Sequence, residues 1–292
     1  MFDRLHRSWE LTKQSIAVLR QDKHLVIFPI LSSIACLIVM ASFAVPLLTA
    51  VDWESVSNSA GSQSSAEFKM QPWYYPVLFL FYFVNYFVIA FFNSALIACA
   101  IKRFNGEETS VSIGLAAAAK RLPQLLAWSL VNATVGMVLR MISERAGLLG
   151  RIVIGLVGMV WTIATYFVVP VLVMEGLGPI ASVKRSTQIL RKVWGESLVA
   201  HVGIGAVTGL IGLAVVVLIM GGSVGLAIAT ESYWPAIIGG GLSVIALVLL
   251  ALISSTLQVI VTAACYRFAA TGLIAEQFEG NTLRGMFKVK GE

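Results

Sequence analysis

One segment of the chain has the spacing of a hydrolase nucleophile, because Gly221-Gly222-Ser223-Val224-Gly225 matches the pattern G-x-S-x-G. That pattern activates a serine only on a strand-to-helix turn with a histidine within hydrogen-bond reach. His201 lies 22 residues earlier in the same apolar segment, and a continuous helix would hold the two residues about 33 Å apart. We therefore expect no Ser–His catalysis and interpret these glycines as sites of close helix packing or as an outer turn.

Other motifs of catalysis or cofactor binding are missing from the sequence. It contains neither a phosphate-binding loop G-x-x-x-x-G-K-[ST] nor an H-E-x-x-H pair. Cys36, Cys99 and Cys265 are too widely separated to form a metal cluster by spacing, and we expect them to behave as small buried hydrophobes. The prediction is a protein that is not an enzyme, holds no cofactor or metal and has no nucleic-acid partner.

Uncharged polar residues within the apolar segments are the remaining candidates. Asn132, Ser255 and Gln258 either line a path for a neutral or lipid-like solute or form hydrogen bonds between helices. Interhelical hydrogen bonds of this kind are worth about 0.6–2 kcal/mol each. The same two interpretations apply to Asn85, Asn93, Thr134, Thr162, Thr165, Tyr166, Ser254, Thr256 and Thr262. Proton- or ion-coupled transport is not predicted, because proteins with that function place charged side chains inside the bilayer.

The composition predicts the elements that must position these residues. Of 292 residues, 58% are hydrophobic and 12% are charged, whereas soluble domains carry about 25% charged residues. Together with a mean hydropathy of +0.86, this excludes a water-soluble protein. Six charge-free windows each reach the roughly 18 residues that indicate a membrane-spanning helix. They predict an all-α integral membrane protein, a single domain over 1–292, with spans near 25–48, 74–101, 122–140, 152–174, 198–221 and 236–264.

The orientation of the spans follows from the distribution of basic residues. Seventeen of the 21 Lys and Arg residues lie in the N-terminal segment, the second and fourth loops, and the C-terminal tail over 267–292. Short cytoplasmic segments carry such an excess of Lys and Arg. Both termini are therefore predicted to lie in the cytoplasm, which agrees with an even number of spans.

Three cytoplasmic segments show the helical period and are predicted to form basic amphipathic helices in the headgroup plane. They lie over 1–23, 110–121 and 179–194, directly before the first, third and fifth spans, and we interpret the recurring unit as a threefold internal repeat. The apolar stripes are Phe2, Leu5, Trp9, Ile16 and Leu19 in the first helix, Leu115, Ala119 and Leu122 in the second, and Ile180, Val183, Leu190 and Trp194 in the third. The candidate residues that face anionic lipid or a protein partner are Arg4, Arg7, Trp9, Lys13, Lys184, Arg185, Arg191, Lys192 and Trp194.

Several short motifs resemble those of a known family. They are Arg7-Ser8-Trp9-Glu10-Leu11, the run over 18–23, Phe28-Pro29, the runs over 147–151, 167–172, 175–179 and 184–186, the run over 192–196, and Tyr266-Arg267-Phe268. On these residues the chain resembles an uncharacterised bacterial family of integral membrane proteins over nearly its whole length. The resemblance implies a six-span protein of the inner membrane and supplies no catalytic or binding residues.

Two functional hypotheses follow. The first is a non-catalytic membrane scaffold that engages anionic lipid or a cytosolic partner through its basic cytoplasmic face. The alternative is a channel or facilitator for a neutral or lipid-like solute. The pairs Gly205-xxx-Gly209 and Gly221-xxx-Gly225 pack helices either within one subunit or between copies in a homo-oligomer. Three prolines in or near the spans are expected to kink or end helices locally: Pro29, Pro46 and Pro170.

Overall fold

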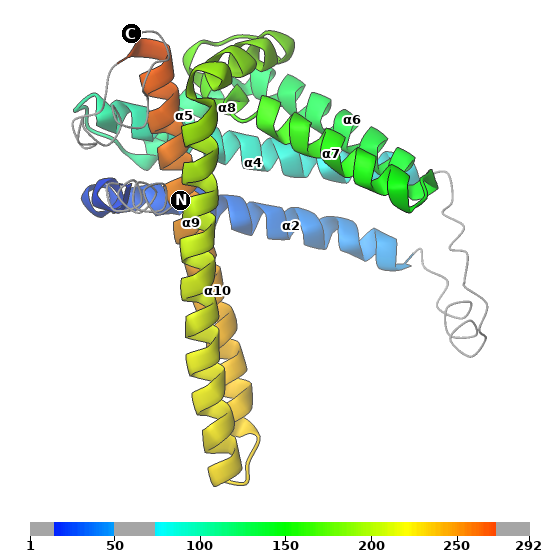
Figure 1. Ribbon diagram of the computed structural model, residues 1–292, viewed down its shortest axis with the longest axis vertical. Helices are drawn as coiled ribbons and strands as arrows, with labels where there is room; N and C mark the ends of the chain where they lie inside the picture. The colour runs from blue at the N-terminus through cyan, green and yellow to red at the C-terminus, as the bar shows by residue number, and fades with distance from the viewer. Residues whose placement is uncertain (1–14, 50–73, 273–292) are drawn as a thin grey trace.

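The structure, a computed structural model, describes residues 15–49 and 74–272, and these residues are almost entirely helical (Figure 1). In chain order the elements are η1 (Lys23–Val26), α2 (Ile27–Thr49), α4 (Tyr74–Phe104), α5 (Val111–Ala119), α6 (Leu122–Arg145), α7 (Leu148–Ala164), α8 (Val168–Met174), α9 (Pro179–Ala229) and α10 (Trp234–Thr271). Residues 15–21 are helical as well. The described residues contain no strand and include six helical segments long and apolar enough to cross a membrane. The predicted fold class is confirmed.

Four helices, α2, α4, α6 and α7, run side by side, and the α9–α10 hairpin runs across them and projects beyond them (Figure 1). Helix α4 is central to this arrangement, because it contacts α2, α5, α6, α8 and α10. The chain reverses direction at each outer turn, so α2, α6 and α9 begin in the same region where α4, α8 and α10 end. We call this region, formed by 15–27, 102–122, 174–192 and 266–272, the basic end.

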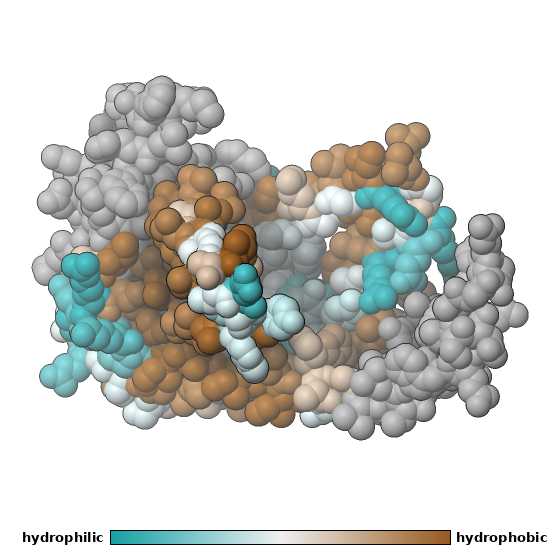
Figure 2. Space-filling model, turned by 90° about the horizontal axis from the view of Figure 1, so that it is seen from below, coloured by the Kyte–Doolittle hydropathy of each residue, from teal (hydrophilic) through white to brown (hydrophobic). Residues whose placement is uncertain are grey.

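Tight packing is concentrated near the basic end. Six helices each contribute a large, fully buried side chain there: Phe28, Leu96, Leu125, Leu172, Ile189 and Ile260. Helix α7, in contrast, has no buried residue, and Leu148 at its start is 78% exposed. Figure 2 shows hydrophilic side chains near two opposite edges of the molecule, with hydrophobic side chains over much of the surface between them and a smaller hydrophilic group near the centre of the view. Helices with apolar surface between polar ends are typical of membrane-spanning segments.

The fifth span differs most from the prediction. The basic helix predicted over 179–194 and the span predicted near 198–221 form one continuous helix, α9, of 51 residues. Its sequence contains no proline after Pro179, and a glycine such as Gly195 costs a helix only about 1 kcal/mol. The helix also continues to Ala229, and the chain turns over 230–233. The interpretation of the glycines over 221–225 as an outer turn is therefore wrong.

Close packing by the predicted glycine pairs is not seen among the described residues. A Cβ atom would have no described neighbour within 4 Å at Gly205, Gly209, Gly221 or Gly225. Helices α9 and α10 instead approach closely at Gly212, where a Cβ would lie 3.1 Å from Leu250, and at Gly239, where it would meet Ser223. Single glycines facing larger side chains make the close contacts of this hairpin.

Other spans are longer than predicted. Helix α4 continues past residue 101 to Phe104, and α6 continues past residue 140 to Arg145. The fourth span, predicted as one helix over 152–174, is divided into α7 and α8. Pro29 and Pro46 lie within α2 and do not end it, so that of the three prolines only Pro170 adjoins a break.

A common ending supports the threefold repeat. The second span of each unit is followed within two residues by a glycine with positive φ, which is 77° at Gly106, 68° at Gly176 and 71° at Gly272. Glycine adopts this left-handed conformation without the steric penalty of a Cβ atom, and it ends a helix by turning the chain. The same device at three equivalent positions is expected if the units share a common plan.

Helix α5 packs on α4 through its smallest residues. Ser110 caps the helix by accepting a hydrogen bond from the Ile113 N–H at 3.3 Å. Gly114 and Ala118 are buried, whereas Ala119 of the predicted stripe is exposed. A Cβ at Gly114 would lie 2.6 Å from Phe28 Cζ, 2.7 Å from Cys99 Sγ and 2.9 Å from the carbonyl oxygen of Ala95. Leu115 of the predicted stripe does pack against the core, but the closest contact is made by Gly114 and Ala118, because a close crossing requires small side chains.

We predict that Gly114→Ala destabilises the protein by about 1–3 kcal/mol, because the added methyl overlaps Phe28, Cys99 and the α4 backbone. The measurement is the thermal unfolding midpoint of the purified full chain in mild detergent. Gly209→Ala is the matched control, since it lies in a helix with no described neighbour within 4 Å and should be neutral or stabilising by up to about 1 kcal/mol. Equal midpoints for the two variants would contradict the packing of α5 on α4.

Candidate functional site

The structure places only part of the lipid- or partner-facing set that the sequence predicted. Arg4, Arg7, Trp9 and Lys13 lie outside the described residues, as do the side chains of Lys192 and Trp194. Lys184, Arg185 and Arg191 lie on the first turns of α9 at the basic end. Lys184 and Arg191 are exposed, and Arg185 is half-buried.

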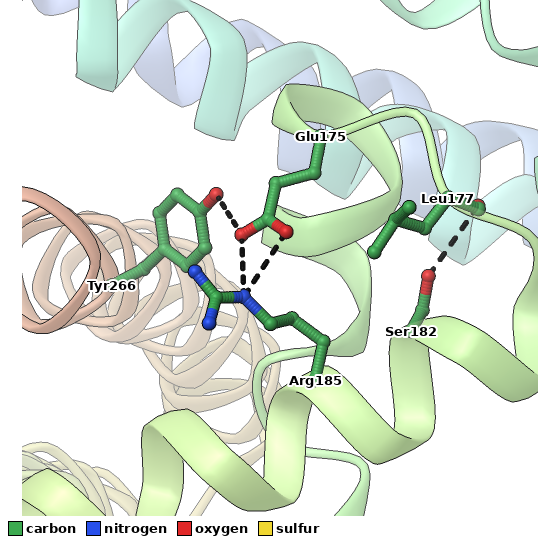
Figure 3. Close-up of polar contacts among 5 residues, drawn as sticks. All are labelled: Glu175, Leu177, Ser182, Arg185 and Tyr266. Carbon is green, nitrogen blue, oxygen red and sulfur yellow. Dashed lines mark hydrogen bonds and ion pairs between the residues drawn. The ribbon is translucent and has the colours of Figure 1, made fainter.

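Glu175 joins three elements at the basic end (Figure 3). It directly follows α8, and both of its carboxylate oxygens accept from Arg185 Nε of α9 at 3.1 Å. The Tyr266 hydroxyl, near the end of α10, donates to Glu175 Oε1 at 3.1 Å. The two charged side chains are 34% and 26% exposed, so solvent screens the pair and its net worth is at most about 1 kcal/mol. Its main effect is to set the positions of α8, α9 and α10 relative to one another.

A second ionic contact ties α4 to the segment that precedes α2. Asp22 Oδ2 lies 3.0 Å from Arg103 Nε, and the side chain of Asp22 is 12% exposed. Thr109, just before α5, donates to the same carboxylate oxygen at 3.3 Å and is hydrogen-bonded to the ring of His24 at 3.0 Å. The first and second repeat units therefore meet at one shielded carboxylate.

Several cations at the basic end are left without a carboxylate. Lys102 pairs with Glu107 at 2.9 Å, and its hydrogen bond and charge lower the pKa of that carboxyl. Arg121 uses its Nε to donate to the Val173 carbonyl at 3.1 Å. In the described part of the chain, no carboxylate pairs with five exposed cations: Arg20, Lys23, Lys120, Lys184 and Arg191.

The break in the fourth span is closed by a side chain from α9. Helix α7 ends at Ala164 and α8 begins at Val168, because Pro170 has no N–H and its ring clashes with the carbonyl four residues earlier. The buried Ser186 hydroxyl donates to the Ala164 carbonyl at 2.7 Å and accepts from the Phe167 N–H at 3.1 Å. One hydroxyl thus satisfies a backbone acceptor and a backbone donor that the break frees in a region where lipid offers no partner.

A cavity of about 320 Å³ lies between α4, α6 and α7. The residues that line it are Tyr86 of α4, Asn132, Val135, Gly136 and Leu139 of α6, Gly158, Trp161 and Thr162 of α7, and Thr165 directly after α7. Trp161 Nε1 donates to Asn132 Oδ1 at 3.3 Å, and the Trp161 ring stacks on Trp128 with centroids 6.2 Å apart. None of the lining residues is buried and Thr162 is exposed, so the cavity opens on the surface of the spanning region.

The polar residues predicted in the sixth span lie apart from this cavity. Ser255 is exposed, Gln258 is half-buried, and neither lines it. Gln258 Nε2 donates to Ser254 Oγ at 3.4 Å, and the Ser254 hydroxyl is hydrogen-bonded to Thr208 of α9 at 3.0 Å. Ser254 therefore connects α10 with α9, Gln258 bonds within α10, and Asn132 lines the cavity.

Ser223 of the G-x-S-x-G pattern lies inside α9. Its hydroxyl donates to the Met220 carbonyl at 3.0 Å, and its side chain lies against Gly239 of α10. The residue is thus in a regular helix, without the strand-to-helix turn on which that motif depends. The side chain of His201 lies outside the described residues.

Sequence reasoning did not single out Tyr86, Trp161 or Ser186. Tyrosine and tryptophan each carry a polar tip on an apolar ring, and such tips find hydrogen-bond partners when they are taken out of water. A tyrosine and a tryptophan in the spans that neighbour Asn132 are the sequence signal that could have indicated a polar site there. For Ser186 the available signal was a small hydroxyl residue on a segment that neighbours a span containing Pro170.

Six apolar helical segments with polar groups gathered at their ends define a multi-pass integral membrane protein of the all-α class. Residues 73–276, more than two thirds of the chain, match a family described as a family of unknown function, DUF6159, and the chain belongs to that family. The match begins just before α4, so α2 and the motifs up to Pro29 lie outside it. No curated protein and no solved structure matches the chain. The predicted resemblance to an uncharacterised family is confirmed.

We predict that Ser186→Ala destabilises the protein by about 1–3 kcal/mol, because it leaves the Phe167 N–H and the Ala164 carbonyl unsatisfied. Hydrogen exchange at the Phe167 amide should rise at the same time. Ser182→Ala is the matched control on the same helix, since that buried hydroxyl makes a single weak bond to the Leu177 carbonyl at 3.4 Å. Equal losses in the two variants would show that Ser186 does not stabilise the break.

Proposed function

We propose that this protein is a non-catalytic scaffold of the bacterial inner membrane that holds anionic lipid headgroups at its basic end, with both termini in the cytoplasm. One observation carries the proposal: five exposed cations at this end have no described carboxylate partner, namely Arg20, Lys23, Lys120, Lys184 and Arg191. Anionic headgroups supply the missing charge, at about 1 kcal/mol per Lys or Arg near the membrane surface.

The placement of two of these cations on α9 supports the proposal. Lys184 and Arg191 are seven residues apart, about two helical turns, and therefore lie on one face. The opposite face of the same helix holds the buried residues Ser182, Ser186 and Ile189. The first turns of α9 thus bury one face in the core and present the other, with its charges, to the surroundings.

The pairing of the other charges at this end also fits the proposal. Asp22 and Glu175 are each used in an ion pair with an arginine, and Glu107 pairs with Lys102. These contacts hold helices or a loop in place and neutralise the cations that they contain. The unpaired cations are therefore separate in role from the residues that maintain the fold, which makes their removal a test of binding.

We predict that Lys120→Gln, Lys184→Gln and Arg191→Gln, made singly, each lower the amount of anionic lipid retained in mild detergent by about fivefold. Retention of anionic lipid should fall because each variant removes one positive charge. The fold should be unaffected, because none of these residues forms an ion pair among the described residues. Phosphatidylglycerol that co-purifies with the full chain is measured by mass spectrometry. Arg145→Gln and Arg151→Gln, exposed at the opposite ends of the spans, are the controls and should retain the wild-type amount. Equal retention by all five variants would contradict the proposal.

Because we propose that the basic end lies in the cytoplasm, we predict that the turn between α9 and α10 lies on the outer side of the membrane. A cysteine at Ser232, in the turn between α9 and α10, should react with a membrane-impermeant maleimide added outside spheroplasts. A cysteine at Lys120, at the basic end, should react only after the membrane is permeabilised. Both are made in a variant whose native Cys36, Cys99 and Cys265 are replaced by alanine, and that variant alone is the control for background labelling. The reverse pattern would overturn the orientation.

A further inference from the structure

The cavity between α4, α6 and α7 lies at the depth of the lipid chains. Asn132 is ten residues from the start of α6 at the basic end, and Gly158 is ten residues from the start of α7 at the opposite end. At 1.5 Å per residue, each lies about 15 Å along its helix. The apolar core of a bilayer is about 30 Å thick, so the cavity is near its middle. Because the cavity opens on the surface of the spanning region, its mouth faces lipid.

The lining offers polar groups without formal charge. The Trp161 indole can only donate a hydrogen bond, so it bonds to the side-chain oxygen of Asn132. The two N–H groups of Asn132 Nδ2 remain free to donate to a ligand. The Tyr86 hydroxyl lies beside Gly136, where a Cβ would be 3.4 Å away, and no described residue hydrogen-bonds to it. Both donors therefore belong to residues that line the cavity and have no protein acceptor among the described residues.

Acceptors lie on the other wall. Thr162 donates its hydroxyl proton to the Gly158 carbonyl at 2.9 Å, and Thr165 donates to the Trp161 carbonyl at 2.8 Å. Each hydroxyl oxygen keeps acceptor capacity after it has donated. The cavity can thus donate to a carbonyl or hydroxyl and accept from a hydroxyl.

These properties select one chemical class of ligand. A charged headgroup at this depth would need a compensating charge, and none of the nine lining residues has one. A wholly apolar ligand would leave the free donors of Asn132 and Tyr86 unsatisfied, at a cost. At about 320 Å³ the cavity is near the lower limit of small-molecule sites, so it accommodates a head and not the chains of a lipid.

We propose that this cavity binds the uncharged glycerol head of a diacylglycerol-type lipid, which enters laterally while its acyl chains stay in the bilayer. Its ester carbonyl and hydroxyl oxygens accept from Asn132 Nδ2 and the Tyr86 hydroxyl, and its hydroxyl donates to Thr162 or Thr165. The site is separate from the anionic headgroups proposed for the basic end and does not depend on them.

The test uses the full chain in nanodiscs with a diacylglycerol that carries a photoreactive diazirine near its glycerol. A phosphatidylglycerol with the diazirine at the same position is the comparison. Cross-linked peptides are identified by mass spectrometry. The expected result is labelling of α6 and α7 by the diacylglycerol probe, reduced by excess unlabelled diacylglycerol and not by phosphatidylglycerol.

Two pairs of matched variants locate the site. Gly158→Leu fills the cavity and should lower labelling at least about tenfold, whereas Gly155→Leu, on the same helix with no described neighbour within 4 Å, should not change it. Asn132→Leu removes the donor and should lower labelling about fivefold, whereas Thr134→Val, whose hydroxyl bonds only to its own helix, should not.

The outcomes separate the two proposals. Equal labelling by both probes, or labelling that Gly158→Leu and Asn132→Leu leave unchanged in normally folded protein, would overturn the diacylglycerol site. If Gly158→Leu does not fold, Asn132→Leu and the competition by unlabelled lipids decide. Lys184→Gln should leave diacylglycerol labelling unchanged while it lowers anionic lipid retention, so failure of one proposal is visible independently of the other.

Discussion

The interior of a bilayer provides no hydrogen-bond partner to a backbone N–H or carbonyl, and the rest of this structure depends on that constraint. It explains why every described span is a helix, and why the one break, between α7 and α8, is closed by a hydroxyl from another helix. Ser186 therefore links the backbone of the second repeat unit to the third. A proline in the fourth span is compatible with the membrane because α9 supplies this partner.

The same constraint directs charge to the ends of the helices, where charged groups connect the repeat units. Asp22 contacts Arg103 and Thr109, Glu175 contacts Arg185 and Tyr266, and Arg267 donates to the Phe104 carbonyl. Each contact is modest in energy because it is partly solvated. Together they join segments far apart in the sequence into one polar layer beside the buried core. The cations outside this layer's ion pairs are those that we propose bind anionic lipid.

The six spans and the helical class were predictable, because the cost of burying a charge in lipid leaves long charge-free windows in the sequence. The starts of the helices predicted over 110–121 and 179–194 also agree with the structure, in which Ser110 caps α5 and Pro179 begins α9. The ends of the helices were less predictable from the sequence. The continuity of α9 through Gly195 and the extension of α6 to Arg145 were not predicted, because a charge-free window stops at a charged residue whereas a helix continues through charged residues and single glycines.

The candidate sites were also predictable only in part from the sequence. Asn132 was identifiable as an uncharged polar residue within a span, but its partner Trp161 and the Tyr86 hydroxyl were counted as apolar, since their polar tips matter only where helices bring them together. By itself, the sequence determined the class, the number of spans and the separation of charge from lipid, because these depend on the transfer of side chains between water and lipid. The tertiary structure decided which glycines permit close contact, which cations are neutralised and where a polar cavity opens, because these depend on distances between segments remote in the chain.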